Sequence, residues 1–356
     1  MSALTAMALV ICFATPGLAS NTVTGMVRNQ TRGQPAVGEE VILLRLDGGI
    51  LEEARTKTDA QGAFAMDLQH PDRPYLVRVV HQNVNYDQEA SAGDALSLSV
   101  FDASSHVSGV TGTIEILRAG TRGKMLHVSD MYEIRNASSP PVTQASERTL
   151  EVYLPAQAKL DSVLAAGPGK IGVTISATPL PHDPGHYSVN FPLQPGATKF
   201  AFNYDLPYDG HAAFQTRHVY PVQQLAVLIP PTMRFSSRSP GFQVLATGNS
   251  QYQVHAVGQL KAGKGPEFEL TGTGALPSIS AQALRRAGPQ TSVRLNSGVS
   301  RPDRPFLLMA AHRSSILGEP LPSAPWRVWA GVIGASLAAV AFLVWQLGIR
   351  QTPSAR

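Results

Sequence analysis

The sequence contains almost no cysteine. Its one thiol, Cys12, lies near the N-terminus in a segment that resembles a secretory signal. The chain that follows such a signal has no thiol, which excludes disulfide bonds, zinc sites built on cysteine and thiolate catalysis. We therefore expect domains whose stability comes from ordinary apolar cores.

Familiar motifs of hydrolases and nucleotide-binding enzymes are also missing. No histidine is followed three residues later by a glutamate, and no His-Glu-x-x-His, Gly-x-Ser-x-Gly or phosphate-loop pattern occurs. A triad assembled from distant residues would escape such a search. We expect a protein that is not an enzyme and that carries no cofactor.

Charged residues make up only 15% of the chain, and the excess of arginine lies near the C-terminus. Without residues 275–325 and the flanks of the apolar run after them, the chain is mildly acidic. Nucleic-acid binding needs a concentrated basic face, so we expect no nucleic-acid partner. We interpret 275–325, rich in proline, serine and arginine, as a solvated stem, with contact to anionic headgroups as the alternative.

The longest uncharged run covers residues 328–349. As a helix rising about 1.5 Å per residue, this run crosses a hydrocarbon core of roughly 30 Å. Trp326, Trp329 and Trp345 lie at its two edges, where indole rings prefer the headgroup layer. The sequence therefore predicts a transmembrane helix with interfacial tryptophans, followed by a short tail at 350–356.

Residues 1–20 predict the orientation of the chain. An apolar stretch too short to span a membrane precedes small residues of the kind found at signal cleavage sites, although no basic residue comes before Arg28. A signal peptide followed by one late span predicts a single-pass membrane protein. Its body would be extracytoplasmic, in a periplasm or at the cell surface, and its tail cytoplasmic.

Between residues 22 and 274, apolar and polar residues alternate with a period of two. The alternation is clearest at 150–154, 171–175, 189–193 and 200–206, and glycine, proline, asparagine and aspartate interrupt it often. This pattern is typical of antiparallel sheets packed as sandwiches. We predict an all-β fold of tandem antiparallel β-sandwich domains of Ig-like or prealbumin-like type.

Composition suggests the domain boundaries. The first domain is expected at 21–118, before a glycine-basic hinge at 119–124, and the second at 125–274. Residues 231–274 either complete the second domain or form a small third one. Completion is favoured, because about 40 residues build a poor core. Within the stem, a short helix over 279–286 is one alternative.

Three pieces of the first domain occur in a fixed order: Thr-Gly-Met-Val at 24–27, a Pro-Gly turn at 34–41, and Thr-Asp-Ala-Gln-Gly-Ala-Phe at 58–64. In the third piece, the Asp59 side chain can cap its own turn, Gly62 can adopt a positive φ, and Phe64 returns to the core. The ordered set resembles the carboxypeptidase regulatory-like domain, a seven-stranded prealbumin-like sandwich related to Cna B-type repeats. The resemblance covers residues 21–118 and implies a non-catalytic cell-surface module.

One cluster of histidines has the composition of a metal site. His182 and His186 bracket a Pro-Gly turn, and His211 follows in a later loop region. Imidazoles in this arrangement could bind copper or zinc. The alternative is a solvent-exposed turn without a ligand, because two histidines at this spacing are common by chance. Our prediction is that no metal is bound.

A second candidate lies at residues 203–211, where aromatic residues alternate with asparagine and aspartate. Tyr204, Tyr208 and Asp209 could contact a carbohydrate or peptide by ring stacking and hydrogen bonds. Core packing and turn chemistry explain the same residues equally well.

Two functions fit these observations. The first is a non-enzymatic envelope or cell-surface protein whose sandwich domains bind a protein or a glycan, held at the membrane by the C-terminal helix. The alternative is an accessory subunit of a membrane complex for transport, electron transfer or assembly, whose helix packs on partners. Small residues near one face of the span permit such packing: Gly331, Gly334, Ala335 and Ala338.

Overall fold

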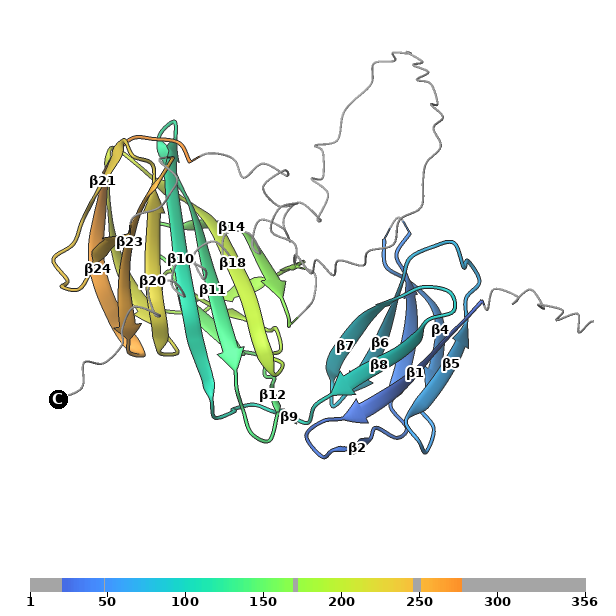
Figure 1. Ribbon diagram of the computed structural model, residues 1–356. Helices are drawn as coiled ribbons and strands as arrows, with labels where there is room; N and C mark the ends of the chain where they lie inside the picture. Colours follow the sequence, from blue (N-terminus) through green and yellow to red (C-terminus); the bar gives the residue numbers. More distant parts are fainter. Residues whose placement is uncertain (1–20, 48, 169–171, 246–250, 277–356) are drawn as a thin grey trace, which may run out of the picture. The chain divides into compact units, whose positions relative to one another are not determined.

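The computed structural model describes residues 21–47, 49–168, 172–245 and 251–276, and every regular element in them is a β-strand (Figure 1). The predicted all-β class is therefore confirmed. The chain forms two compact units. The first contains the described residues up to Val107 together with Ser138–Ala145, and the second contains Ser108–Ala137 and the described residues from Ser146 onward.

The first unit consists of two four-stranded sheets and a short two-stranded ribbon. One sheet contains β1 (Thr22–Asn29), β2 (Gln34–Pro35), β5 (Ala63–Asp67) and β8 (Ala95–Val100); the other has the order β4 (Leu51–Lys57), β3 (Glu40–Arg45), β6 (Tyr75–His81), β7 (Val84–Ala90); and the ribbon pairs β9 (Ala103–Ser104) with β12 (Thr143–Gln144). One apolar core joins residues of both sheets, including Val27 and Phe64 from one and Val41 and Tyr75 from the other.

The turn at residues 58–64 has the geometry predicted from its sequence. Asp59 Oδ1 accepts hydrogen bonds from the backbone N–H groups of Gln61 and Ala63, at 2.9 and 2.8 Å. Gly62 has a φ of 79°, and a Cβ there would lie 2.5 Å from the carbonyl oxygen of Val27. Phe64 is buried opposite Gly25, whose missing side chain leaves room for the ring. Turn chemistry and core packing therefore specify the same register.

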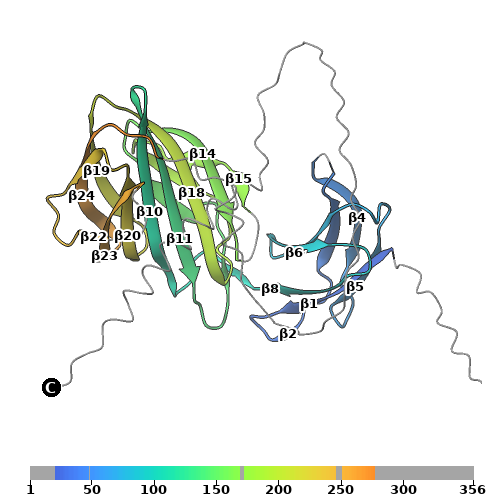
Figure 2. The same cartoon turned by 45° about the horizontal axis from the view of Figure 1, so that its top comes forward.

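The second unit is built on an eight-stranded sheet, here called the large sheet, in which β14, β18, β11 and β10 lie side by side (Figures 1 and 2). Its strands, in spatial order, are β15 (Val173–Ile175), β14 (Lys159–Ala166), β18 (Gly196–Pro207), β11 (Met125–Asn136), β10 (Val110–Arg122), β20 (Val222–Ile229), β23 (Gln253–Leu260) and β22 (Gln243–Leu245).

Two three-stranded sheets belong to the same unit. They contain, in spatial order, β13 (Leu150–Tyr153), β17 (His186–Val189) and β16 (Ala177–Pro179) in one, and β19 (His211–His218), β24 (Gly263–Gly272) and β21 (Met233–Ser236) in the other. Of the strands after residue 231, β24 pairs with β19 and β23 pairs with β20, while β21 and β22 pair with β24 and β23, so all four complete the second unit.

Both predictions about strand direction and the hinge need correction. The pairs β1–β8, β10–β20 and β9–β12 are parallel, because period-two alternation reports which residues are buried and not the direction of the neighbouring strand. Residues 119–124 are no hinge: they form the end of β10 and its tight turn to β11, where Gly123 has a φ of 60°. The sequence does not distinguish the two, because a tight turn with glycines and basic residues has the same composition as a flexible linker.

Several predicted segments lie outside the described residues, namely the signal at 1–20, nearly all of the stem and the run at 328–349 with Trp326, Trp329 and Trp345. Within the ranges that the structure describes, no helix has the length and apolarity needed to cross a membrane.

Candidate binding site

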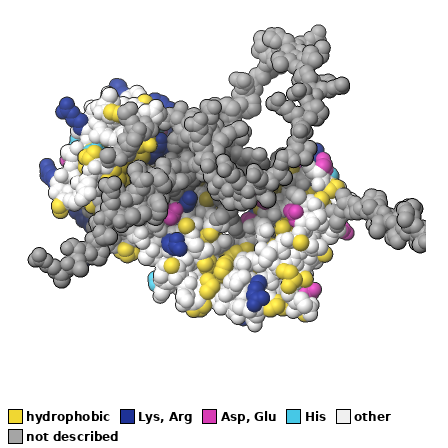
Figure 3. All heavy atoms as spheres, viewed as in Figure 1, with side chains coloured by type: hydrophobic (Ala, Val, Ile, Leu, Met, Phe, Trp, Pro, Cys, Tyr) yellow, Lys and Arg dark blue, Asp and Glu magenta, His cyan; other side chains and the backbone are white. Residues whose placement is uncertain are grey.

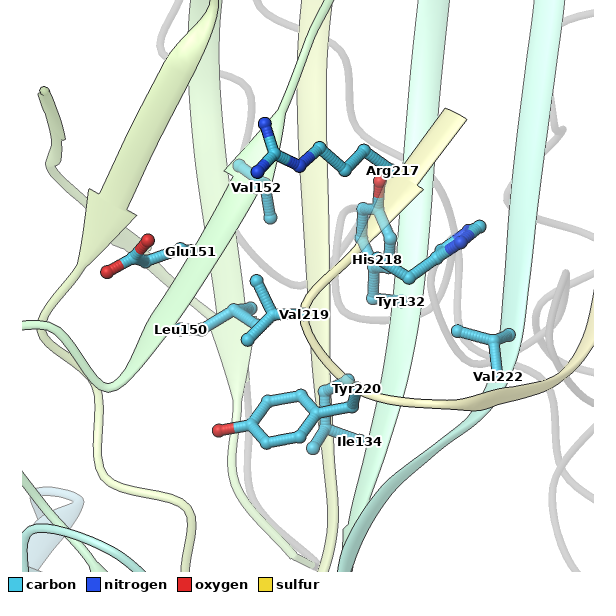
Figure 4. A pocket seen from close by; sticks show the side chains of 10 residues that line it. All are labelled: Tyr132, Ile134, Leu150, Glu151, Val152, Arg217, His218, Val219, Tyr220 and Val222. Carbon is cyan, nitrogen blue, oxygen red and sulfur yellow. The ribbon is translucent and has the colours of Figure 1, made fainter. Parts of the chain in front are cut away.

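A pocket of the second unit opens at the seam between its two three-stranded sheets. Strands β13 and β19 border this seam as neighbours, while each pairs within its own sheet. The space in the pocket, counted out to the open solvent at its mouth, is about 290 Å³. Ten residues line it, as Figure 4 shows: Tyr132, Ile134, Leu150, Glu151, Val152, Arg217, His218, Val219, Tyr220 and Val222. We call it the seam pocket.

Strand alternation decides which side chains reach the seam pocket. In β13, Leu150 and Val152 are buried, while Glu151 and Tyr153 between and after them reach the surface in part. The chain leaving β19 alternates in the same way, with His218 buried between the exposed Arg217 and Val219. The pocket therefore has an aliphatic interior and a polar rim.

An irregularity in β19 places the most prominent rim residue. The register of β19 against β24 shifts between Gln215 and Arg217, as it does at a β-bulge, which re-aims side chains. The Arg217 guanidinium lies 4.1 Å from the centre of the Tyr153 ring across the seam. Such a cation–π contact is worth about 0.5–2 kcal/mol, depending on its exposure. Arg217 takes part in none of the ion pairs between described residues.

The stack continues on the other side of Tyr153. The ring of His186 lies 4.0 Å from that of Tyr153 at an angle of 18°. His186 Nε2 lies 2.8 Å from Glu151 and its Nδ1 lies 3.1 Å from Asp183. Both carboxylates therefore engage the imidazole, which leaves the cation of Arg217 as the group of this stack that remains available to an anion.

Beneath the pocket lies a group of buried ionisable side chains, which we call the buried acid cluster: Glu115, Asp130, Tyr132, Tyr204 and His218. His218 Nε2 lies 2.5 Å from Glu115, and both side chains are only 2% exposed. Tyr132 donates a hydrogen bond of 2.8 Å to Asp130. The chains of β10, β11, β18 and β19 thus meet around two carboxyl groups.

Burial controls the ionisation of this cluster. Burial and the nearby Glu115 raise the pKa of Asp130 well above its ordinary value, and the hydrogen bond from Tyr132 opposes them only in part. Burial, followed by the charge of Asp130, also raises the pKa values of Tyr132 and Tyr204. Two carboxyl groups that share this space cannot both be charged without large cost, so burial and Glu115 favour the protonated form of Asp130.

The cluster contains the residue types of a general acid–base site, but its carboxyl groups are not accessible to a substrate. Glu115 and Asp130 do not line the seam pocket, and only Tyr132 and His218 reach it. Catalysis requires a group within hydrogen-bond reach of a substrate. The arrangement is suited to holding the pocket floor rigid beneath a bound group, and not to transferring protons to it.

The structure does not bring the three candidate metal ligands together. Among the residues it describes, no group of three or more His, Cys, Asp or Glu side chains could hold a metal ion. His182 is exposed, with a φ of 67°, and His211 pairs with Glu269 at 3.5 Å in another sheet. His186 is buried against Tyr153 and Glu151. The turn between His182 and His186 leaves the first residue exposed and the second buried, and the spacing of the two residues in the sequence does not reveal this difference.

The structure buries both tyrosines of the candidate ring-stacking site. Tyr204 is 2% and Tyr208 7% exposed, because the alternation of β18 directs both inward. Tyr208 donates a hydrogen bond of 2.6 Å to the Gly272 carbonyl, and Tyr204 belongs to the buried acid cluster. Asp209 alone is exposed. Core packing therefore accounts for both tyrosines.

Sequence reasoning missed the residues of the seam. Tyr153 and Arg217 are far apart in the chain, so no local pattern relates them. Asp130 had a readable signal, because it occupies a position where the alternation of β11 predicts an apolar residue, whereas Glu115 lies between Ile114 and Ile116, where alternation predicts a polar one. A carboxylate at such a position marks an interior with ionisable groups.

The described surface shows how charge is distributed. On the face seen in Figure 3, lysine and arginine side chains lie singly or in small groups between polar and apolar atoms. The positive charge of Arg217 matters here because this residue lines the largely apolar seam pocket.

Comparison with known proteins adds little. No protein-family model and no curated protein matches the chain. Among solved structures, it is similar to an M1 zinc metallopeptidase from Deinococcus radiodurans, with 10% identity and a TM-score of 0.29 over 46% of this chain and 42% of that one. For a mutant of that enzyme bound to a Tyr-Ser-Ala substrate, the identity is 9% and the TM-score 0.29, over 46% of this chain and 43% of that one. The chain thus spans less than half of these proteins' length, and a similarity this low carries no functional argument.

Proposed function

We propose that the chain is a membrane-anchored, extracytoplasmic binding protein without enzymatic activity, and that its seam pocket receives an apolar group of a partner protein. The observation that carries this proposal is the pairing of an aliphatic pocket with an exposed cation. Val219, at 39% exposure, and the neighbouring Arg217 lie at its rim.

The lining of the pocket favours a protein over a glycan. Five aliphatic side chains and two tyrosines line it, whereas sugar sites need many hydrogen-bonding groups. An anchor residue that enters an apolar pocket is typical of the energetic centre of a protein interface. A carboxylate beside that anchor would pair with Arg217. The ligand we propose is therefore an apolar side chain next to an acidic group.

The first unit supports the surface location. Its turn at residues 58–64 and the Gly25–Phe64 contact are the features by which residues 21–118 resemble the carboxypeptidase regulatory-like domain. We propose a prealbumin-like sandwich for this unit and an Ig-like arrangement for the second. The signal at 1–20 and the span at 328–349 supply export and anchoring in this proposal.

The test uses the full-length protein in its native membrane, with a photo-crosslinking phenylalanine analogue in place of Val219. We expect it to capture one specific protein. A matched control carries the analogue at Val244, which is 71% exposed in the same unit and outside the pocket. Arg217→Glu should abolish capture, while Arg238→Glu, at another exposed arginine, should not.

Two results would contradict the proposal. One is equal capture from Val219 and Val244, and the other is capture that Arg217→Glu leaves unchanged. Replacing residues 328–349 by an unrelated apolar helix separates the accessory-subunit alternative. Capture at Val219 should survive this exchange if the pocket binds the partner, and it should be lost if the helix itself does.

A further inference from the structure

The turn between β16 and β17 contains the only aspartyl–prolyl peptide bond in the sequence, between Asp183 and Pro184. The backbone N–H of His186 donates a hydrogen bond of 3.0 Å to the Asp183 carbonyl, and Gly185 has a φ of 86°. Proline followed by a glycine with positive φ forms a type II turn. The carbonyl group of this peptide bond is therefore already polarised by a fixed donor.

The turn is held firmly against the end of β13. Leu154 donates its backbone N–H to the Gly185 carbonyl at 2.8 Å, and a Cβ on Gly185 would lie 2.2 Å from the Leu154 carbonyl oxygen. His182, just before the bond, has a φ of 67°, a conformation that few residues with a side chain adopt. Such strain persists only where the surroundings enforce it, and it clusters at functional sites.

An imidazole faces the aspartate of this bond. His186 Nδ1 lies 3.1 Å from the Asp183 carboxylate, and its Nε2 lies 2.8 Å from Glu151. The Tyr153 ring stacks on the imidazole at 4.0 Å and fixes its plane. Glu151 therefore orients the histidine toward the aspartate, as the third member of a catalytic triad orients its base.

We propose that the chain cleaves its own peptide bond between Asp183 and Pro184. The Asp183 carboxylate attacks its own carbonyl carbon, and a cyclic anhydride forms as the C–N bond to Pro184 breaks. The backbone N–H of His186 stabilises the oxyanion, and the proton on Nδ1 moves to the leaving proline nitrogen. Water then opens the anhydride, and its two protons go to the imidazole and to the new prolyl amine. The products are an Asp183 with two carboxylates and a chain that begins at Pro184.

The exposure of the two side chains suits these steps. The Asp183 side chain is 49% exposed, so water reaches the anhydride, whereas the His186 side chain is 11% exposed and stays in place. Pro184 has no amide hydrogen, so its nitrogen leaves as a secondary amine, which accepts a proton readily.

A cut at this bond would leave the second unit assembled. Strands from before and after the cut are neighbours in the large sheet, where β11 pairs with β18 along its full length and β10 pairs with β20. The first unit and residues 328–349 would belong to different fragments. Sheet pairing alone would then connect the first unit to the proposed membrane anchor. This consequence, unlike the cleavage itself, rests on the function proposed above.

The test incubates the purified full-length chain at about pH 5.5 and follows it by gel electrophoresis and N-terminal sequencing. We expect one cut, with the new N-terminus Pro-Gly-His-Tyr. Asp183→Ala removes the nucleophile and should leave the chain intact, while His186→Gln should slow cleavage about 100-fold. Asp209→Ala, at another exposed turn of the same unit, should be cleaved like the unaltered chain.

Cleavage should also depend on pH, because the imidazole must carry the proton that it donates. We expect a slower reaction at about pH 8.5 than at about pH 5.5. The charged and titratable groups around the imidazole are Glu151 with its partner Arg148, Asp183, and Tyr153 with Arg217 on its ring.

A second measurement separates this reaction from simple lability of the bond. In urea at the same pH, the turn and the Glu151 contact are lost, and cleavage should slow at least about tenfold. Equal rates with and without urea would overturn the proposal, as would an intact unaltered chain or a cut in Asp183→Ala. If His186→Gln does not fold, Glu151→Gln replaces it, and an unchanged rate in that variant would equally contradict the mechanism.

Discussion

The two units bury ionisable groups in different places. In the first unit, the core shared by its sheets is aliphatic and aromatic, and the His81–Glu39–Asp102 network lies at its margin, with carboxylates 19% and 21% exposed. In the second unit, three ionisable residues lie inside the core, and each is at most 5% exposed: Glu115, Asp130 and His218.

Burying a charged group costs free energy, and removing one partner of a buried pair costs more, because the other charge is left unpaired. The first unit therefore has the character of a scaffold, whereas the second retains costly groups directly below the seam pocket, with Arg217 at its rim.

The largest effect should come from breaking the buried pair. His218→Leu leaves the Glu115 carboxylate without a partner, and we expect the second unit to lose about 3–5 kcal/mol of unfolding free energy. Adding Glu115→Leu should recover most of this loss, because an apolar pair would make the second core resemble the first. Denaturant titration of the full chain measures both variants. A double variant as unstable as His218→Leu would contradict this interpretation.

In the first unit, the corresponding weak point is steric. Gly25→Ala would place a Cβ 2.4 Å from the ring of Phe64, so we expect a loss of about 1–3 kcal/mol from overpacking. Phe64→Leu in the same chain should relieve part of it. Thermal unfolding followed by near-ultraviolet circular dichroism reports the change. Additive losses in the double variant would rule out the contact as the cause.

The marginal network of the first unit should respond to acid. Burial would raise the pKa of Asp102, but hydrogen bonds from Arg32, Asn29 and His81 outweigh it and lower the pKa to about 2. A carboxyl pKa lowered on folding stabilises the protein above its unfolded value near 3.8, and this contribution is lost as the pH falls toward 2. Asp102→Asn should cost about 2 kcal/mol at pH 7 and little near pH 2. A constant difference between these pH values would contradict the assignment.

The buried acid cluster should show the opposite pH dependence. Because burial and Glu115 raise the pKa of Asp130, the folded state holds a proton that the unfolded state releases, and stability falls as the pH rises above about 4. Asp130→Asn keeps an acceptor for Tyr132 and removes this titration. Its stability should therefore fall less steeply between pH 5 and 8 than that of the unaltered protein. Parallel curves for the two proteins would disprove the assignment.

Local features of the fold could be predicted from the sequence, and relations between distant elements could not. The alternation at 200–206 correctly predicts that Phe200, Phe202 and Leu206 share a buried face, and the turn at Asp59 follows from its own residues. β10 and β20 are neighbours in the sheet but far apart in the sequence, so their parallel pairing depends on the path of all the strands that separate them along the chain. The seam pocket depends on Tyr153 and Arg217 meeting across two sheets, which no short pattern encodes.

The return of Ser138–Ala145 to the first unit makes that unit discontinuous in the sequence. Within it, Tyr86 lies 2.9 Å from the buried Thr143 hydroxyl, and β12 pairs with β9. The β10–β11 hairpin is therefore, in genetic terms, an insertion into the gene segment of the first unit. A truncated chain that ends anywhere between Val107 and Ser138 lacks residues that this unit needs, and a recombination event at that point would separate Tyr86 from Thr143. The smallest transferable first unit extends to Ala145 and carries the hairpin with it.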